Sequence, residues 1–175
     1  MDRGCVQVYC GNGKGKTTAA VGLCVRAAGQ GLRVLFLQIM KDGTSGELRG
    51  LAHLPGVTVL DGPQVAGFPG LEDQAPSDGL AERHRLRFRE AVRRVSGGEF
   101  DLLVLDEANG AMHQGLLPAE EVAAFLDARP KGLEVVLTGR HPPAAILDRA
   151  DYVSEIRCRK HPYREGQAAR RGIEW

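Results

Sequence analysis

Short apolar segments alternate with longer amphipathic ones along this chain. Apolar runs with the length of buried strands lie at residues 6–10, 34–39, 57–60, 102–105, 135–138 and 152–156. Helical spacing of apolar residues occupies residues 17–28, 80–95, 118–128 and 142–148. Strands that are apolar on both faces and alternate with helices are typical of a parallel sheet covered by helices on both faces. The pattern therefore predicts an α/β fold with a mostly parallel sheet.

Two stretches break this alternation. Residues 40–56 are rich in glycine and polar residues, and residues 61–79 contain four glycines and three prolines. Both stretches are therefore predicted to be loops. Loops of this length in a compact domain more often serve a function than merely connect elements.

Composition narrows the class of protein further. The 175 residues predict one domain, residues 1–175, at roughly 150 residues per domain. The chain is 43% hydrophobic and 26% charged, as in ordinary globular proteins, and its net charge of +1 does not indicate nucleic acid as a partner. No apolar run approaches the roughly 20 residues that span a bilayer, and no apolar signal region opens the chain, so we expect a cytoplasmic protein without a membrane partner. The four cysteines form no Cys-x-x-Cys pair, which favours reduced thiols over zinc ligands.

The clearest chemical signal lies between the first predicted strand and the first predicted helix. This phosphate loop consists of Gly11, Asn12, Gly13, Lys14, Gly15, Lys16, Thr17 and Thr18. Glycines let the backbone curl so that its N–H groups point at phosphate oxygens, and the start of the helix adds partial positive charge. We predict that Lys16 contacts the terminal phosphates of a nucleotide and that the Thr17 hydroxyl binds Mg²⁺.

The loop departs from the general G-x-x-x-x-G-K-[ST] motif at its start. Cys10 stands where that motif has its first glycine, so the turn must begin at Gly11. Lys14 is an additional cation, which either contacts phosphate or is simply exposed. A glycine-rich turn with chance lysines is the alternative interpretation, and the strand and helix on either side disfavour it.

Two later segments also end apolar strands with polar side chains. Asp106 and Glu107 follow the buried strand 102–105, which is how a metal-side carboxylate reaches a phosphate site from a neighbouring strand. Asp106 would hold Mg²⁺ directly or through water, and Glu107 would be linked to the metal or orient a reactant. The alternative is a helix N-cap with a first-turn carboxylate. Arg140 follows the strand 135–138, and it either bridges to phosphate or substrate or is a surface arginine in a turn.

These motifs together resemble the ATP:corrinoid adenosyltransferase family. The likeness is carried by residues 11–20, 38–41, 103–107 and 137–140, by residues 146–155, and by the tail segments 160–163, 166–169 and 172–175. It covers nearly the whole chain in order. It implies a RecA-like P-loop domain that transfers the 5′-deoxyadenosyl group of ATP to the cobalt of a reduced corrinoid. Triphosphate would be released, in the biosynthesis or salvage of adenosylcobalamin.

The resemblance also assigns roles to individual residues. Phosphate binding falls on residues 11–18, and binding of Mg²⁺ (or Mn²⁺) falls on Thr17 and Glu107 with Asp106 beside them. The family has a Gly-Phe-x-Trp segment in the loop that removes the lower ligand of cobalt, and here residues 67–70 keep Phe68 but have glycine in place of tryptophan. Phe68 would be an apolar wedge against the corrin face; the alternative is that it anchors the loop in a small hydrophobic cluster. With Lys16 and Glu107 it completes the predicted catalytic set.

The partners implied are ATP, a reduced corrinoid, a second copy of the chain and a flavoprotein as candidate electron donor. The arginine-rich segment 80–95 would contact nucleic acid or the anionic side of the corrinoid, or form a solvated face with its glutamates, and the last interpretation is favoured. Two other functions stay open: a generic P-loop ATPase or phosphotransferase, and a nucleotide-dependent corrinoid-binding switch.

Overall fold

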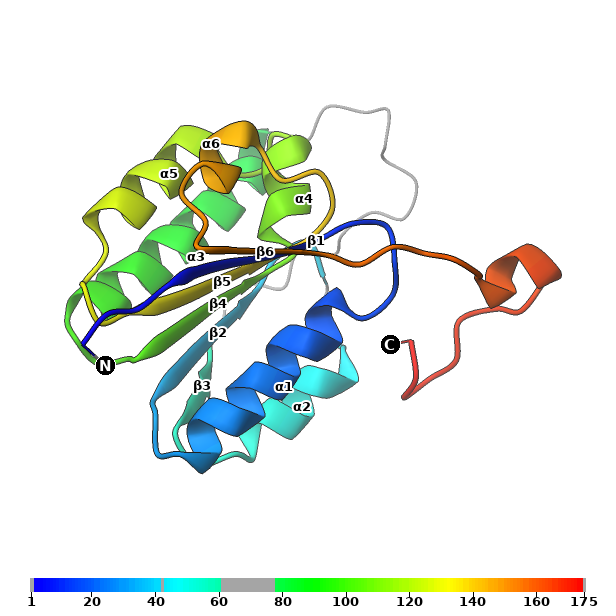
Figure 1. Ribbon diagram of the computed structural model, residues 1–175, viewed down its shortest axis with the longest axis horizontal. Helices are drawn as coiled ribbons and strands as arrows, with labels where there is room; N and C mark the ends of the chain where they lie inside the picture. Colours follow the sequence, from blue (N-terminus) through cyan, green and yellow to red (C-terminus); the bar gives the residue numbers. More distant parts are fainter. Residues whose placement is uncertain (1, 42, 61–77, 175) are drawn as a thin grey trace.

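All strands of the described chain lie parallel in a single sheet. A computed structural model describes residues 2–41, 43–60 and 78–174 (Figure 1). The strands are β1 (Val6–Cys10), β2 (Val34–Gln38), β3 (Val57–Val59), β4 (Leu102–Asp106), β5 (Glu134–Thr138) and β6 (Tyr152–Glu155). Their order is β3-β2-β4-β5-β1-β6, and every neighbouring pair is parallel. The carboxyl ends of β1, β2, β4 and β5 therefore meet at one edge of the sheet.

Helices cover both faces of this sheet. They are α1 (Lys16–Gly29), α2 (Gly46–Ala52), α3 (Asp78–Ser96), α4 (Ala108–His113), α5 (Ala119–Ala128), α6 (Ala144–Leu147) and the 3₁₀ helix η1 (Pro162–Glu165). Figure 1 shows α1 and α2 on one face and α3, α4, α5 and α6 on the other. The predicted α/β fold with a parallel sheet between two helical layers is confirmed.

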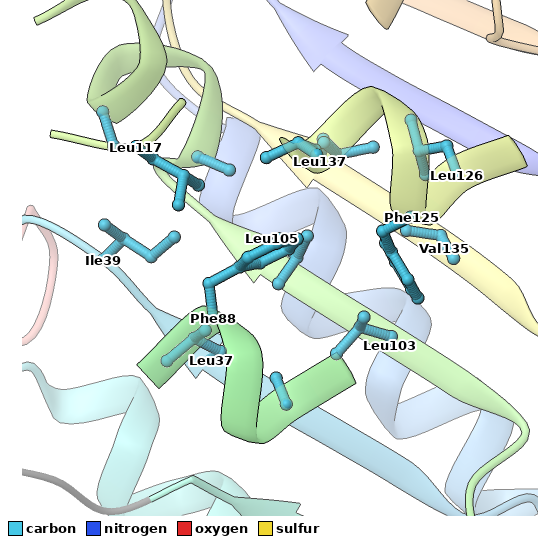
Figure 2. Close-up of a cluster of buried hydrophobic side chains, with 14 of the residues drawn as sticks. Leu37, Ile39, Phe88, Leu103, Leu105, Leu117, Phe125, Leu126, Val135 and Leu137 are labelled. Atoms are coloured by element: carbon cyan, nitrogen blue, oxygen red, sulfur yellow. The ribbon is translucent and has the colours of Figure 1, made fainter. Parts of the chain in front are cut away.

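Each face of the sheet has its own hydrophobic core. Alternate residues of β4 point to opposite faces, so Leu103 packs in the core under α3 and α5 while Val104 packs in the core under α1. Figure 2 shows Phe88 of α3 and Phe125 of α5 in the larger core. Their rings meet edge to face with centroids 5.9 Å apart, a geometry that favours aromatic pairs.

Every predicted strand and helix is present, with ends within two residues of the prediction. The prediction of one loop over residues 40–56 is wrong in part, because α2 forms within it, and α4 was not predicted either. Both helices contain glycine, which has low helix propensity. Each is stabilised by burial of apolar side chains, Leu51 in α2 and Met112 in α4. Tertiary packing has therefore overridden local propensity at both places.

Several arginines of α3 form ion pairs or ring contacts with other residues of the chain. Arg85 and Arg89 pair with Glu121 of α5 at 2.6 and 2.7 Å, and Arg93 pairs with Glu90 at 2.7 Å. The Arg94 guanidinium lies 5.2 Å from the centroid of the Phe100 ring. These contacts favour the interpretation of α3 as a solvated face held to α5. Among the helices of the described ranges, none has the length and apolar character needed to cross a membrane.

Candidate active site

The phosphate loop connects β1 to α1 at the carboxyl edge of the sheet. Gly11 and Gly15 have φ angles of 99° and 118°, values that residues with a side chain rarely adopt. A Cβ at Gly11 would collide with the carbonyl oxygen of Ile156, and the same oxygen accepts a hydrogen bond from the Gly13 N–H at 2.7 Å. The backbone therefore turns at Gly11, one residue later than in the general motif. The segment after β6 packs against this turn and accepts a hydrogen bond from it.

Lys16 and Thr17 are the first two residues of α1. The Lys16 Nζ donates to the carbonyl oxygen of Gly13 at 2.9 Å, and its side chain is buried. Burial lowers the pKa of Lys16, and Arg140 nearby lowers it further, while Glu107 opposes both effects. The Thr17 hydroxyl donates to Asp106 Oδ1 at 2.8 Å. Because its proton is used in this bond, the Thr17 oxygen has lone pairs left for a cation.

Asp106 organises the centre of the site. Its carboxylate is fully buried at the end of β4, where it accepts hydrogen bonds from Thr17 and Thr138 at 2.8 Å each and from Gln38 Nε2 at 3.1 Å. The Lys41 Nζ lies 3.5 Å away. A carboxylate taken out of water needs such hydrogen-bond partners, because a buried polar group without them is costly. Asp106 therefore holds the Thr17 hydroxyl in place from behind the site rather than facing the cavity.

Glu107 is the carboxylate that does face the cavity. It takes the N-cap position of α4 with a φ of 62°, and its side chain makes no capping hydrogen bond. Its N–H donates to the Thr138 hydroxyl at 2.9 Å, which fixes the backbone at the strand end. Burial raises the pKa of Glu107, and the charge of Asp106 adds to this. The alternative of an N-cap with a first-turn carboxylate is therefore wrong, because Glu107 is itself the N-cap residue and its side chain does not cap α4.

Backbone strain is concentrated at the same edge of the sheet. In residues 2–41, 43–60 and 78–174, the non-glycine residues with left-handed φ are Met40, Glu107 and His141. They lie just past the ends of β2, β4 and β5 respectively. Such conformations cost roughly 1 kcal/mol or more each and cluster at functional sites. Their positions mark the carboxyl edge as the functional edge.

A cavity of about 510 Å³ opens beside the phosphate loop. It is lined by Gly13, Lys14, Gly15, Lys16, Thr17 and Thr18 of the loop and by Glu107, which directly follows β4. The remaining predicted binding residues, Gly11, Asn12 and Arg140, line a second cavity of similar size on the other side of the loop. The Asn12 side chain accepts a hydrogen bond from the Cys158 N–H at 2.9 Å. Phe68 lies outside the described residues.

Several residues of this site have no role in the sequence interpretation. Lys41 and Glu47 line the main cavity and pair at 3.2 Å. Burial disfavours the charge of Lys41, but Asp106 and Glu47 raise its pKa overall. The position of Gln38 and Lys41 at the carboxyl end of a parallel strand was the signal that could have found them. The tail residue Glu174 also lines the cavity, and the sequence has no local signal for that contact.

The donors in the cavity fit a hard divalent cation. Thr17 and Glu107 supply a hydroxyl and a carboxylate oxygen, and oxygen donors suit Mg²⁺ or Mn²⁺. The described residues contain no cluster of three or more His, Cys, Asp or Glu side chains that could hold a metal alone.

A parallel α/β sheet with a phosphate loop in its first strand–helix connection defines a P-loop protein. The family model for ATP:corrinoid adenosyltransferase BtuR/CobO/CobP matches residues 2–175, and the chain belongs to this family. It is 36% identical to the corrinoid adenosyltransferase of Escherichia coli K12 over 174 residues, which cover 99% of this chain and 87% of the relative. Identity is also 36% to the corrinoid adenosyltransferase CobA of Salmonella typhimurium, with the same coverage. It is 33% to the corrinoid adenosyltransferase of Pseudomonas aeruginosa, with 99% and 85% coverage.

Proposed function

We propose that this chain transfers the 5′-deoxyadenosyl group of ATP to the cobalt of a reduced corrinoid and releases triphosphate. The observation that carries the proposal is the family match over residues 2–175, together with a cavity in which Lys16, Thr17 and Glu107 converge. Pockets of this volume commonly hold small ligands and cofactors. In this proposal the reaction serves the biosynthesis or salvage of adenosylcobalamin.

The triphosphate would bind along the phosphate loop. The loop N–H groups and the start of α1 attract anions, and Lys16 would exchange the Gly13 carbonyl oxygen for a phosphate oxygen. Thr17 and Glu107 would hold Mg²⁺, with Asp106 bound to it directly or through water, and the ion supplies further positive charge to the triphosphate when bound. Asp106 keeps the Thr17 hydroxyl oriented for this role. Arg140, on the other side of the loop, lies close enough to Lys16 and Glu107 to add to the positive field.

In this reaction the main contribution of the protein is to stabilise the negative charge of the leaving triphosphate. The electron pair of Co(I) forms a bond to C5′ of the ribose, and the C5′–O bond breaks with its electron pair on the triphosphate. Cobalt is formally oxidised to Co(III), and no proton has to move. Lys16 and the loop N–H groups would stabilise the departing polyanion as the bond breaks. No activated water is needed, so Glu107 has no task as a general base here.

Anaerobic incubation with ATP, Mg²⁺ and chemically reduced cobalamin tests this proposal. We expect the visible spectrum of a carbon–cobalt bond, with intact triphosphate as the second product. ADP and phosphate as products would instead identify an ATPase or phosphotransferase. Binding of both ligands without turnover would identify a nucleotide-dependent switch.

Phe68 is proposed as the wedge that keeps the lower face of cobalt free of a ligand. Loss of an axial donor makes Co(II) easier to reduce, so Phe68→Ala should lower activity with Co(II) corrinoid more than with pre-reduced Co(I) corrinoid. Equal activity of the variant and the parent with both substrates would rule this role out. Gly70 stands where the family has tryptophan, so Phe68 would act without that aromatic partner.

The proposal extends to the state in which the protein works. We expect a homodimer, which sedimentation velocity will test, and a single domain over residues 1–175. A flavoprotein would supply the electrons, and replacement of the chemical reductant by a reduced flavoprotein will test that donor. Cytoplasmic action is supported by the four cysteines, all of which are free thiols.

A further inference from the structure

The end of the chain returns to the phosphate loop. After β6 the backbone runs away from the sheet to η1 and then turns back, and Figure 1 shows the returning red segment on the side of the molecule where α1 begins. Gly172, Ile173 and Glu174 line the same cavity as Lys14, Lys16 and Thr17. Residues separated by most of the sequence thus share the walls of the proposed nucleotide site.

Glu174 makes the contacts that hold this tail. Its Oε1 accepts a hydrogen bond from Lys14 Nζ at 2.9 Å. Its carboxylate also accepts from the Arg170 backbone N–H at 2.8 Å and from the Arg170 guanidinium at 3.0 and 3.2 Å. Hydrogen bonds from Arg170 and Lys14 hold the pKa of Glu174 well below its usual range. The carboxylate is therefore ionised at neutral pH.

This arrangement opposes the binding of a polyanion. The charge of Lys14 is matched by Glu174, and the Glu174 carboxylate itself stands at the rim of the cavity. A triphosphate entering the cavity would meet that negative charge and would compete with it for Lys14. Glu174 has a second cation in Arg170, four residues earlier, so it stays paired when Lys14 leaves.

We propose that residues 170–174 form a latch, closed on the phosphate loop in the empty protein and released when the triphosphate of ATP takes Lys14 from Glu174. The latch rests on the proposed binding of ATP at this loop. Exchange of one carboxylate for a polyphosphate keeps Lys14 paired in both states, so the switch leaves no cation without a partner. The turn from Arg170 to Glu174 moves as a unit because its internal bonds persist.

Glu174→Gln removes the charge of the latch and keeps its shape. Calorimetric titration of the full chain with ATP and Mg²⁺ should give binding about two- to tenfold tighter than for the parent, as expected for loss of one exposed ion pair and one repulsive charge. Glu165→Gln is the matched control, because Glu165 lies in the same tail and pairs with Lys160 at 3.0 Å away from the cavity. The control should bind ATP as the parent does.

Limited trypsin digestion reports the latch in the parent protein without any substitution. Cleavage after Arg170 or Arg171, followed by mass spectrometry of the released end of the chain, should become faster when ATP and Mg²⁺ are added. In Glu174→Gln it should be fast already without ATP.

The two measurements separate this inference from the proposed function. Parent protein that binds ATP, with Glu174→Gln binding equally or more weakly, overturns the latch and leaves the proposed function standing. Slower cleavage on addition of ATP likewise overturns it, because the tail would then close over bound nucleotide. Parent protein that does not bind ATP overturns both proposals.

Discussion

At the scale of single residues, one carboxylate sets the geometry of the site. Asp106 accepts hydrogen bonds from the hydroxyls of Thr17 and Thr138 and from the amide of Gln38. It also forms an ion pair with the ammonium of Lys41 at 3.5 Å. These groups come from α1 and from the ends of two strands, β2 and β5, on either side of β4. The bonds from Gln38 and Thr138 are buried, and breaking either would leave a buried polar group without that partner, which is costly. The Thr17 hydroxyl and the Glu107 backbone are thereby positioned before any ligand arrives.

Replacement of Lys16 should reduce the affinity for ATP more than replacement of any other residue of the site. In Lys16→Ala we expect ATP affinity to fall by about a hundredfold or more and adenosyl transfer to become undetectable, because a charge-assisted contact to the leaving group is lost. Titration calorimetry and the cobalamin assay measure the two effects. Lys131→Ala, a change at an exposed lysine outside the cavity, is the control. Binding within threefold of the parent would contradict the role of Lys16.

His84 makes stability depend on pH. The side chain is fully buried in α3, and burial, with repulsion from Arg87 and Arg83, lowers its pKa to about 4. Between pH 6.5 and 4 the unfolded chain therefore binds a proton that the folded chain does not, so stability falls as pH is lowered through this window. We expect a loss of about 2 kcal/mol, less than the full shift implies because solvent screens the arginines.

Urea denaturation at pH 7.5 and pH 4.5 checks this effect. In His84→Leu the part of the pH dependence that belongs to His84 should disappear, whereas His53→Gln, at an exposed histidine, should keep it. Identical pH profiles for His84→Leu and the parent would exclude His84 as the source.

At the scale of elements, the connection from β1 to α1 depends on backbone shape more than on side chains. The turn at Gly11 is possible because no Cβ stands between it and Ile156, and the segment after β6 closes against it. The phosphate loop is thus shaped partly by an element at the other end of the chain. Tight contact between the two segments links the loop geometry to the docking of β6.

Gly11→Ala should disrupt this connection. The φ of 99° and the collision with the Ile156 carbonyl oxygen predict a loss of about 2 kcal/mol or more in stability and a large loss of ATP binding. Gly22→Ala is the matched control, since Gly22 lies inside α1 with open space around its Cβ position. That change should stabilise the protein by about 0.5 to 1 kcal/mol. Thermal unfolding of both variants gives the comparison, and equal stability of the two would contradict the argument.

At the scale of the whole molecule, one sheet separates two cores that cannot form independently. Leu103 and Val104 are neighbours on β4, both fully buried, and they belong to different cores. Each strand thus contributes to both layers at once. Loss of packing on one face weakens the strand that the other face needs.

We therefore expect a single unfolding transition for the whole chain. Leu103→Ala should cost about 2 to 5 kcal/mol and Val104→Ala about 1 to 3 kcal/mol, from lost burial and the cavities that remain. Both variants should keep one transition by calorimetry and by circular dichroism. Two separate transitions in either variant would show that the layers unfold independently.

Much of this protein follows from local sequence signals. The apolar runs predict β2 and β4 because a strand buried on both faces has no polar position, and the glycine and lysine pattern after β1 predicts a phosphate loop. The acidic pair after β4 was also visible, because it directly follows a buried strand. These signals are short in range, and each depends on residues adjacent in the chain.

The short helices α2 and α4 could not be found this way. Their glycines argue against helix, and they form because Leu51 and Met112 find apolar partners on the sheet. Gln38 and Lys41 carried only the weak positional signal of a strand end. Glu174 carried none, since its partner Lys14 lies 160 residues away in the sequence.

The sequence by itself determined the alternation of strands and helices, the phosphate loop and the carboxylates at 106 and 107. Only the tertiary structure decided which carboxylate faces the cavity, because Asp106 is buried by hydroxyls from α1 and β5 while Glu107 is turned outward by a left-handed backbone. Only the tertiary structure placed Glu174 beside Lys14. Local patterns report the environment of neighbouring residues, whereas contacts between distant residues depend on how the sheet orders its strands.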